Sequence, residues 1–350
     1  MMGTYRFLLA ILVALSHMGV SVAGLNPGVF AVISFFLISG FVMTGLLGTH
    51  YAVWSKVPLF YIDRVARIFP QYLLFMMLTL LAHALLRFES PFLSSPSAWA
   101  LLGNVLVLPL DFFMFSPQVA GYMLLPQAWS LGLELMFYLL VPWLLLGRLR
   151  DAAFAASLLV WLVAAFGIIH TDAWGYRLLP GTLFMFLAGS YVYDQRQFSL
   201  KHPVPWLLAF LLLYAVALQA FGRLGLPYNR EVMAGLLAGS VALFGLARLT
   251  RNRWDDWLGN LSYGVFLSHV LVVRLFEAAL GQPRANAWPA TVLVAMLVVS
   301  TLLAWLGYVL VERPVLRWRR RYRLRSELGN DGSTSGAQGP QSLVSGRNRA

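Results

Sequence analysis

The sequence predicts an all-α, polytopic integral membrane protein with about ten transmembrane helices. Its 350 residues are 59% hydrophobic and only 11% charged, whereas a soluble domain carries about 25% charged residues. Many of its apolar runs approach or exceed the roughly 20 residues that a helix needs to cross a bilayer. Because these runs are continuous and do not alternate between apolar and polar residues, they predict helices rather than strands.

Ten apolar segments are predicted to cross the membrane. They are residues 5–24, 28–48, 69–87, 127–147, 152–170, 177–194, 204–222, 231–248, 258–280 and 288–311. We assign residues 1–315 to this transmembrane core. Residues 316–350 are predicted to form a basic juxtamembrane segment and a disordered cytoplasmic tail, because arginines cluster after Trp318 and the chain then becomes rich in Gly, Ser, Gln and Asn.

An eleventh apolar run, 98–115, contains Asn104, Pro109 and Asp111 and lies in a connection rich in Pro and Ser. If this run crossed the membrane, every later loop would change sides and the basic tail would face outside. With ten crossings and a cytoplasmic N-terminus, 20 of the 26 basic residues face the cytoplasm, the exceptions being Arg87, Arg177, Arg223, Arg230, Arg274 and Arg284. The positive-inside rule therefore favours a re-entrant or interfacial segment near 98–115 and places both termini in the cytoplasm.

Composition also excludes several functions. The net charge of +12 does not indicate nucleic-acid binding, because the basic residues lie in short loops and in the tail. The absence of Cys excludes disulfide bonds, thiolate catalysis and zinc–cysteine sites. No spacing of His, Asp and Glu resembles a metal site, so no metal is expected.

The first apolar segment carries two ionisable residues, Arg6 and His17. Eleven residues of helix return to within roughly 20° of the starting direction and rise about 16 Å. Arg6 is therefore predicted at one membrane surface, with His17 above it near the bilayer centre. Ionisable groups at that depth are costly and usually functional. A free imidazole, with a pKa of about 6.5, can act as a base or a nucleophile; the alternative is a histidine bonded to a neighbouring helix.

Glu134 lies about seven residues, or 10 Å, into a helix that enters from outside. Ser130, Glu134 and Tyr138 share one face of that helix. We predict that Glu134 meets His17 near the middle of the membrane, where a carboxylate orients an imidazole and raises its basicity. The alternative is that Glu134 is a structural partner of a nearby Ser or Tyr.

Arg64 and Arg67 share a face at the cytoplasmic end, just before the segment 69–87. Guanidinium groups match phosphate oxygens, so these two arginines, bordered by Arg6, are predicted to bind an anionic cofactor. Ordinary positive-inside topology is the alternative for each of them.

Weaker signals come from the C-terminal third of the chain. Ser262 and His269 lie seven residues apart on one helical face, so His269 either contacts the site or packs between helices. Glu312 and Arg313 end the last segment and suggest a local ion pair.

The residues above belong to motifs that follow one another along the chain. The motifs are Arg6-x10-His17, Phe35-Phe36-x-x-Ser39-Gly40-Phe41, Arg64-x-x-Arg67-Ile68-x-Pro70-x-Tyr72, Trp129-Ser130-Leu131-x-x-Glu134-x-x-Phe137-Tyr138-x-x-x-Pro142, Leu261-Ser262-Tyr263-x-x-x-Leu267-x-His269 and Glu312-Arg313-Pro314. Their order resembles the membrane acyltransferase 3 family, which includes bacterial O-acetyltransferases of lipopolysaccharide O-antigen, exopolysaccharide and other surface glycans. The resemblance runs from residue 6 to about residue 314.

The resemblance implies an inner-membrane O-acyltransferase that takes an acyl group, expected to be acetyl, from cytoplasmic acetyl-CoA or another acyl-CoA. The acceptor would be a hydroxyl of a cell-surface polysaccharide or lipid-linked glycan. In this interpretation His17 and Glu134 are catalytic, and Arg6, Arg64 and Arg67 bind coenzyme A. The residues expected to contact the acceptor are Trp129, Ser130, Tyr138 and His269.

Two alternatives stay open at this point. One is acylation of a small molecule such as an antibiotic sugar. The other is a proton-coupled transporter or flippase whose buried histidine and glutamate relay protons, although the sequence shows no inverted repeat.

The sequence departs from the family pattern at two positions. Ile33 stands where members often have an acidic residue before the Phe-Phe pair, so the role of that acid is absent or supplied elsewhere. Asp63 stands where members often have Arg, which weakens the positive cluster beside Arg64.

Overall fold

The computed structural model describes residues 1–194, 203–250, 252–281 and 288–318. Across these residues the chain is helical, with no strand beyond one isolated bridge between Val22 and Leu25. The all-α prediction is therefore confirmed. Most of the tail predicted for 316–350 lies outside the described residues, which end at Trp318.

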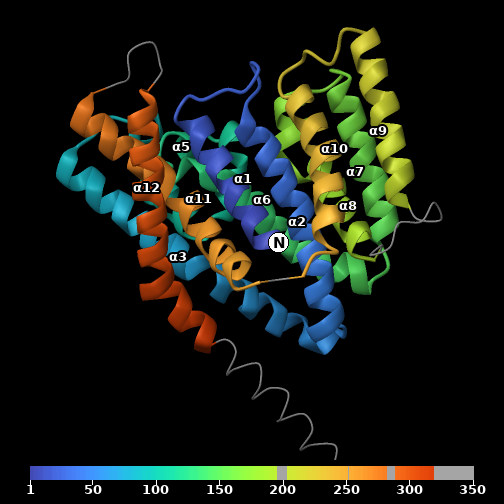
Figure 1. Cartoon of the computed structure of the whole chain (residues 1–350), viewed down its shortest axis with the longest axis horizontal. Helices are drawn as coiled ribbons and strands as arrows, with labels where there is room; N and C mark the ends of the chain where they lie inside the picture. The colour runs from blue at the N-terminus through green and yellow to red at the C-terminus, as the bar shows by residue number, and fades with distance from the viewer. Residues whose placement is uncertain (195–202, 251, 282–287, 319–350) are drawn as a thin grey trace, which may run out of the picture.

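Each of the ten predicted segments corresponds to a long helix in the described part of the chain (Figure 1). These helices are α1 (Met2–His17), α2 (Pro27–His50), α3 (Val57–Leu86), α6 (Trp129–Leu146), α7 (Arg150–Ala165), α8 (Leu179–Asp194), α9 (Pro203–Ala220), α10 (Asn229–Leu246), α11 (Arg253–Leu280) and α12 (Ala290–Gly307). The apolar runs therefore predicted where the helices lie.

Six helical stretches within the described residues are long and apolar enough to cross a membrane. They are Pro27–His50, Trp54–Leu86, Pro126–Leu146, Pro203–Ala220, Arg253–Leu280 and Ala290–Trp318, whereas the apolar helix Met2–His17 is shorter. The prediction of about ten crossings is thus supported for these six and stays a prediction for the others.

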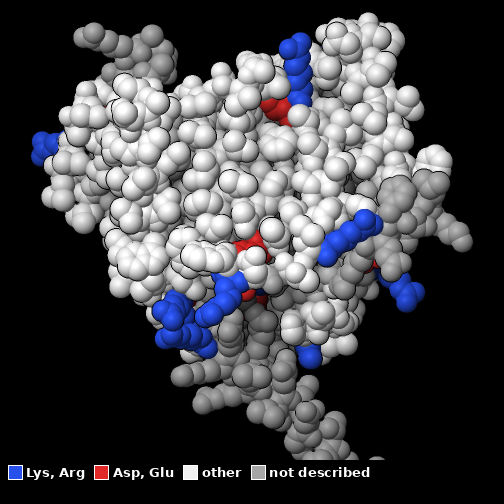
Figure 2. Space-filling view, in the orientation of Figure 1, with Lys and Arg blue, Asp and Glu red and all other residues white. Residues whose placement is uncertain are grey.

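The surface of the molecule is suited to contact with lipid. Large apolar side chains such as Leu85, Leu213 and Val216 are about 70% exposed, which is unusual for a protein surrounded by water. Figure 2 shows a face whose middle is almost free of charge, with basic side chains gathered mainly along the lower edge, near the end of α12. On this face the distribution leaves an apolar band across the helices.

The first helix is shorter than predicted. α1 ends at His17, and residues 18–26 form turns in which Gly19 has a φ of 86° and Gly24 a φ of 75°. Asn26 then caps α2 by accepting a hydrogen bond from the Gly28 amide at 2.8 Å. The segment 5–24 was wrong at its end because an apolar turn and an apolar helix look alike in hydropathy. His17 therefore lies at the end of a helix and not in its middle.

The third helix begins earlier than predicted. α3 starts at Val57, with Pro58 in its first turn, so Arg64 and Arg67 lie inside the helix and not before it. Charged residues lower the hydropathy of a segment, but arginine is a good helix former. In Figure 1, α3 runs obliquely across the lower part of the bundle from beside the end of α2 to the opposite edge.

The run 98–115 is not one continuous helix. It consists of α4 (Ala98–Leu106) and the 3-10 segment η3 (Leu108–Phe115), separated by Val107 with a φ of 66°. Tyr72 of α3 donates a hydrogen bond to the Asn104 carbonyl at 2.7 Å, and Asn104 in turn bonds the backbone of Tyr122 and Leu124. A nine-residue helix is about 14 Å long, too short to cross a bilayer. Its re-entrant or interfacial placement stays a prediction.

Glycines bring the central helices into backbone contact. α1 packs on α11, where a Cβ on Gly259 would lie 2.9 Å from the Gly3 Cα atom, and Thr4 donates its amide to Asp255 at 2.8 Å. α2 packs on α8, where a Cβ on Gly189 would lie 1.8 Å from the Leu37 carbonyl oxygen. Because lipid provides no hydrophobic driving force between helices, their association depends on close packing, which small residues at these crossings allow. The contact between Gly3 and Gly259 thus holds α1 against α11 inside the bundle.

The substitution Gly40→Ala is expected to destabilise the protein. A Cβ at Gly40 would lie 1.6 Å from the Phe186 carbonyl oxygen, so α2 and α8 must separate; overpacking of this kind costs typically about 1–3 kcal/mol. Gly48→Ala on the same helix is the matched control, because its Cβ would meet nothing within 4 Å. Thermal unfolding of the detergent-solubilised variants measures the difference. Equal midpoints for the two variants would contradict this packing.

Candidate functional site

Two cavities lie inside the helical core. The first, which we call the arginine cavity, has a volume of about 150 Å³ and is lined by Arg6, Arg64, Arg67 and Glu134 among others. The second, which we call the histidine cavity, has a volume of about 390 Å³, and its lining includes His17 and Arg177 as well as residues of the connections that follow α1 and α3. Most of the predicted site residues are therefore divided between these two cavities.

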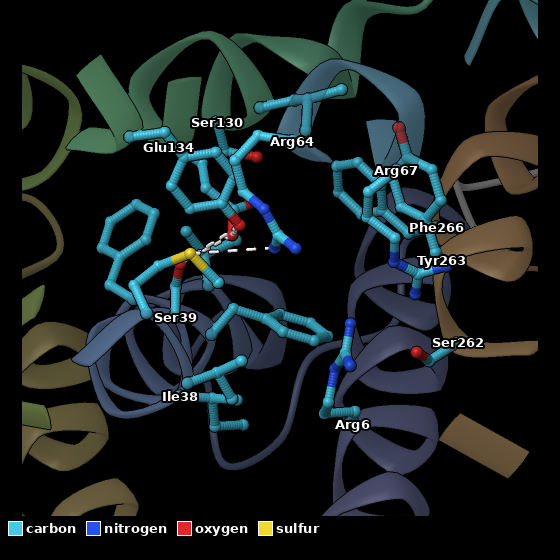
Figure 3. A pocket seen from close by; sticks show the side chains of 17 residues that line it. Arg6, Ile38, Ser39, Arg64, Arg67, Ser130, Glu134, Ser262, Tyr263 and Phe266 are labelled. Atoms are coloured by element: carbon cyan, nitrogen blue, oxygen red, sulfur yellow. Dashed lines mark hydrogen bonds between the residues drawn. The ribbon is translucent and has the colours of Figure 1, made fainter. Parts of the chain in front are cut away.

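Three guanidinium groups point into the arginine cavity, Arg6 from α1 and Arg64 and Arg67 from α3 (Figure 3). The three arginines thus lie together, as the sequence predicted. Arg64 stacks over the ring of Tyr138 at 5.8 Å, and Arg67 over the ring of Tyr263 at 5.9 Å. Planar stacking of this kind holds a guanidinium in a defined direction.

The α3 arginines each have an acidic partner. Arg64 forms an ion pair with Asp63, the residue that stands where the family often has Arg. Arg67 forms an ion pair with Glu312, where the sequence suggested that Glu312 would pair with Arg313. Asp63 and Glu312 are only 3% exposed, and buried charges require such partners. The positive cluster is thus more closely balanced than the sequence indicated.

Glu134 lies in the arginine cavity within a hydrogen-bonded group. Tyr138 donates its hydroxyl to the Glu134 Oε1 atom at 2.5 Å, and Ser39 of α2 donates to the same atom at 2.7 Å (Figure 3). Ser39 belongs to the Phe-Phe-x-x-Ser-Gly-Phe motif but received no role from the sequence. The structural alternative that we kept for Glu134, partnership with a Ser and a Tyr, is the one observed.

The predicted pair of His17 and Glu134 was wrong. The two side chains line different cavities. Because α1 ends at His17, the imidazole lies at the level of the 18–26 loop, whereas Glu134 lies about one and a half turns inside α6. The prediction had assumed that His17 sits midway along a longer helix. Glu134 therefore cannot orient His17 in this arrangement.

His17 presents one ring nitrogen to the histidine cavity. Its Nδ1 atom lies 2.9 Å from the Val13 carbonyl oxygen. A carbonyl only accepts hydrogen bonds, so Nδ1 carries a proton, and in the neutral imidazole Nε2 keeps its lone pair. The ring is exposed to the cavity. This tautomer makes Nε2 a proton acceptor.

His269 lies against His17. The two ring centroids are 4.9 Å apart, and His269 is fully buried. Its Nδ1 atom donates to the Val265 carbonyl at 3.2 Å, while Nε2 has no hydrogen-bond partner among the described residues. His269 lines neither cavity, and its contact with an acceptor stays a prediction.

The other three residues predicted to contact the acceptor lie along α6, but they do not all line the same cavity. Trp129 lines the histidine cavity, Ser130 lines both cavities, and Tyr138 lines only the arginine cavity. Tyr138 lies beside Glu134 and Arg64, and its contact with an acceptor stays a prediction. Its position four residues beyond Glu134 puts it one turn deeper in the helix.

Arg177 is the residue of the histidine cavity that the sequence analysis missed. Its guanidinium lies 4.7 Å from the ring centroid of Trp129, 5.2 Å from that of Tyr176 and 5.4 Å from that of Phe113. Its Nε donates to Asp172 at 2.7 Å. The sequence signal that could have identified Arg177 is Tyr176 directly before it, with Asp172 five residues before it. In the sequence analysis Arg177 counted only as one of the six basic residues predicted to face outside.

Ile33 has an apolar environment. It is fully buried, and a Cβ on Gly235 of α10 would lie 2.8 Å from the Ile33 Cβ. The side chain thus packs against α10. In this chain the position serves helix packing, which agrees with the absence of an acidic residue there.

Stability is expected to fall as pH rises from about 4 to about 8 because of Asp111. This residue of η3 is fully buried, and neither carboxyl oxygen accepts a hydrogen bond within the described part of the chain. Burial raises the pKa of Asp111 from 3.8 to about 8, although the positive charge of Arg177 lowers it. The folded state holds one more proton than the unfolded state across that interval, so raising the pH favours unfolding. Asp111→Asn should flatten the pH profile of the unfolding midpoint; an unchanged slope would show that Asp111 is ionised in the folded protein.

The fold and its two cavities define a multi-pass helical membrane protein in which a basic chamber adjoins a chamber with a proton-accepting imidazole. The model of the acyltransferase domain family, Acyl_transf_3, matches residues 4–309. The chain belongs to this family, and the resemblance noted in the sequence is confirmed.

Two relatives extend the comparison. An uncharacterized protein of Aquifex aeolicus is 33% identical over 204 residues, which cover 56% of this chain and 89% of that protein. The exopolysaccharide production protein ExoZ of Rhizobium meliloti is 29% identical over 315 residues, covering 84% of this chain and 91% of ExoZ. No solved structure matches the chain.

Proposed function

We propose that this protein is an inner-membrane O-acyltransferase with cytoplasmic termini. It moves an acyl group, expected to be acetyl, from cytoplasmic acyl-CoA to a hydroxyl of a cell-surface polysaccharide or lipid-linked glycan. The observation that carries the proposal is the adjacency of the two cavities: three guanidinium groups in one, and the unprotonated Nε2 of His17 in the other. Family membership supports acyl transfer, and ExoZ is named for exopolysaccharide production.

The arginine cavity suits the donor. Coenzyme A carries phosphates that bind guanidinium groups and a narrow arm that ends in the thioester. In the proposal Arg6, Arg64 and Arg67 bind the phosphates at the end of the bundle that carries the N-terminus. The arm then follows the apolar wall of the cavity, which includes Val42 and Met43.

The histidine cavity suits the acceptor and the base. Nε2 of His17 takes the proton of the acceptor hydroxyl while the oxygen attacks the thioester carbonyl. The C–S bond then breaks, and the proton passes from the imidazolium to the departing thiolate, which leaves as free coenzyme A. A protonated His17 would be stabilised by its place in the last turn of α1, at the negative end of the helix dipole. Transient acylation of His17 is the alternative route.

The lining of the histidine cavity resembles that of a sugar site. Aromatic rings for stacking alternate with hydrogen-bonding side chains. Residues of the connection that follows α3, such as Phe92, Phe113 and Met123, contribute to this lining. The aromatic residues are Phe92, Phe113, Trp129, Tyr176, Tyr228 and Phe266, and the polar ones include Asn26, Gln127, Arg274 and Glu277.

The test uses membranes from cells that make the protein, because these contain the natural acceptor. Membranes are supplied with radiolabelled acetyl-CoA, and ester-bound label is released by mild alkali. Wild-type membranes should form labelled glycan ester, and membranes from a deletion strain should not. Equal label in both preparations would reject the proposed function.

A further inference from the structure

Three residues line both cavities: Val32 of α2, Ser130 of α6 and Phe266 of α11. They form the partition between the two chambers, which we call the junction. In the proposed reaction the thioester approaches from the arginine cavity and the acceptor from the histidine cavity. The acyl group must therefore lie at the junction during transfer.

The junction has an apolar wall. Val32 contributes an isopropyl group and is 6% exposed, while the ring of Phe266 is half-buried at the edge of the arginine cavity (Figure 3). Phe266 lies 6.1 Å from His269, centroid to centroid, and His269 lies 4.9 Å from His17. Phe266 and His17 thus share His269 as a neighbour and line the same cavity.

Hydrogen bonds tie the parts of the junction together. Gln127, which is 2% exposed, donates its amide to the carbonyls of Phe266 at 3.3 Å and Leu267 at 2.9 Å. Ser130 donates its hydroxyl to the Gln127 carbonyl at 3.2 Å. The start of α6 is therefore fastened to the turn of α11 that carries Phe266. Such a buried network favours a junction of constant width.

We propose that Phe266, with Val32, sets the length of the acyl group that the protein transfers. This inference rests on the proposed function. An acetyl group presents a single methyl to the apolar wall, whereas each further methylene has to occupy space that the Phe266 ring already fills. One methylene in a hydrophobic pocket changes discrimination by about 10- to 200-fold. The protein therefore selects acetyl over longer acyl groups.

The experiment is a competition between two donors. Native membranes holding the full-length protein and its acceptor receive equal concentrations of acetyl-CoA and butyryl-CoA. The ester-bound acyl groups are released by mild alkali and quantified by mass spectrometry. In wild-type membranes acetyl should dominate, and Phe266→Ala should raise the butyryl-to-acetyl ratio by about tenfold or more. Val32→Ala should shift the ratio in the same direction.

Two phenylalanines provide matched controls. Phe276 lies on the same helix, is half-buried like Phe266 and lines neither cavity. Phe35 lines the arginine cavity but not the junction. Phe276→Ala and Phe35→Ala should keep the wild-type ratio. A shift with Phe35→Ala equal to that with Phe266→Ala would overturn the assignment to the junction.

The possible outcomes separate the inference from the proposed function. If wild-type membranes form no ester from either donor above the deletion strain, the proposed function fails. If they form acetyl ester and the ratio is the same in wild type, Phe266→Ala and Val32→Ala, the junction does not select the acyl group and the inference alone is overturned. Should Phe266→Ala lose all transfer, the ratio is measured with Phe266→Leu, which keeps an apolar side chain and still widens the wall.

Discussion

The substitution His17→Ala is expected to reduce ester formation by about 10²- to 10⁴-fold, the usual contribution of a general base. The structure gives the reason: the hydrogen bond from Nδ1 to the Val13 carbonyl leaves Nε2 free to accept a proton inside the histidine cavity. No other described residue that lines this cavity is a histidine. The rate is measured as labelled ester formed per minute in native membranes.

Binding of the donor should survive the same substitution, because His17 does not line the arginine cavity. The half-saturating concentration of acetyl-CoA in any residual reaction, and the binding of coenzyme A to the purified protein, are therefore expected to stay near wild type. His83→Ala is the control, since His83 packs against Phe88 and lines neither cavity. Wild-type ester formation by His17→Ala membranes would exclude His17 as base or acyl carrier.

The second large effect is expected from Arg64→Ala, and it has two parts. Removing the guanidinium leaves the Asp63 carboxylate, 3% exposed, without its ion-pair partner; breaking a buried pair in this way costs about 3–5 kcal/mol. It also removes a charged contact to the donor phosphates. Charged hydrogen bonds contribute about 1.5–3 kcal/mol, so affinity for coenzyme A should fall by about tenfold or more.

A double variant separates stability from binding. Asp63→Asn combined with Arg64→Gln removes both buried charges, so the unfolding midpoint should recover toward wild type. Affinity for coenzyme A, measured by calorimetry on the purified protein, should stay low. Arg253→Gln, at an exposed position at the start of α11, is the control for a general loss of positive charge. Recovery of both stability and affinity in the double variant would show that Arg64 only neutralises Asp63.

The sequence was a good guide to where helices lie and a weaker guide to where they end. Hydropathy reports whether a segment avoids water, and this property is shared by the helix α1 and by the apolar turns that follow His17. The opposite error occurred in α3. Arg64 and Arg67 lowered the hydropathy, so the predicted segment began after them, whereas the helix includes both residues. Helix ends depend on backbone angles and caps such as Asn26, which a hydropathy window does not record.

For the candidate site, too, the sequence was right about one grouping of residues and wrong about another. The sequence correctly grouped Arg6, Arg64 and Arg67, which line one cavity even though Arg64 and Arg67 lie inside α3. It paired His17 with Glu134 incorrectly, because that pairing depended on the exact end of α1. Arg177 was passed over since its aromatic neighbours Phe113 and Trp129 come from distant parts of the chain.

By itself the sequence determined that this protein is a helical membrane protein of an acyltransferase family. It also selected the arginines, the histidine and the glutamate whose roles stay predictions. Those conclusions depend on composition and on spacing within single helices, which are local properties. Only the tertiary structure decided that His17 and Glu134 occupy separate cavities and that Val32, Ser130 and Phe266 stand between them. These three residues come from three helices, and their meeting depends on contacts between distant parts of the chain, such as the hydrogen bonds from Gln127 to the carbonyls of Phe266 and Leu267.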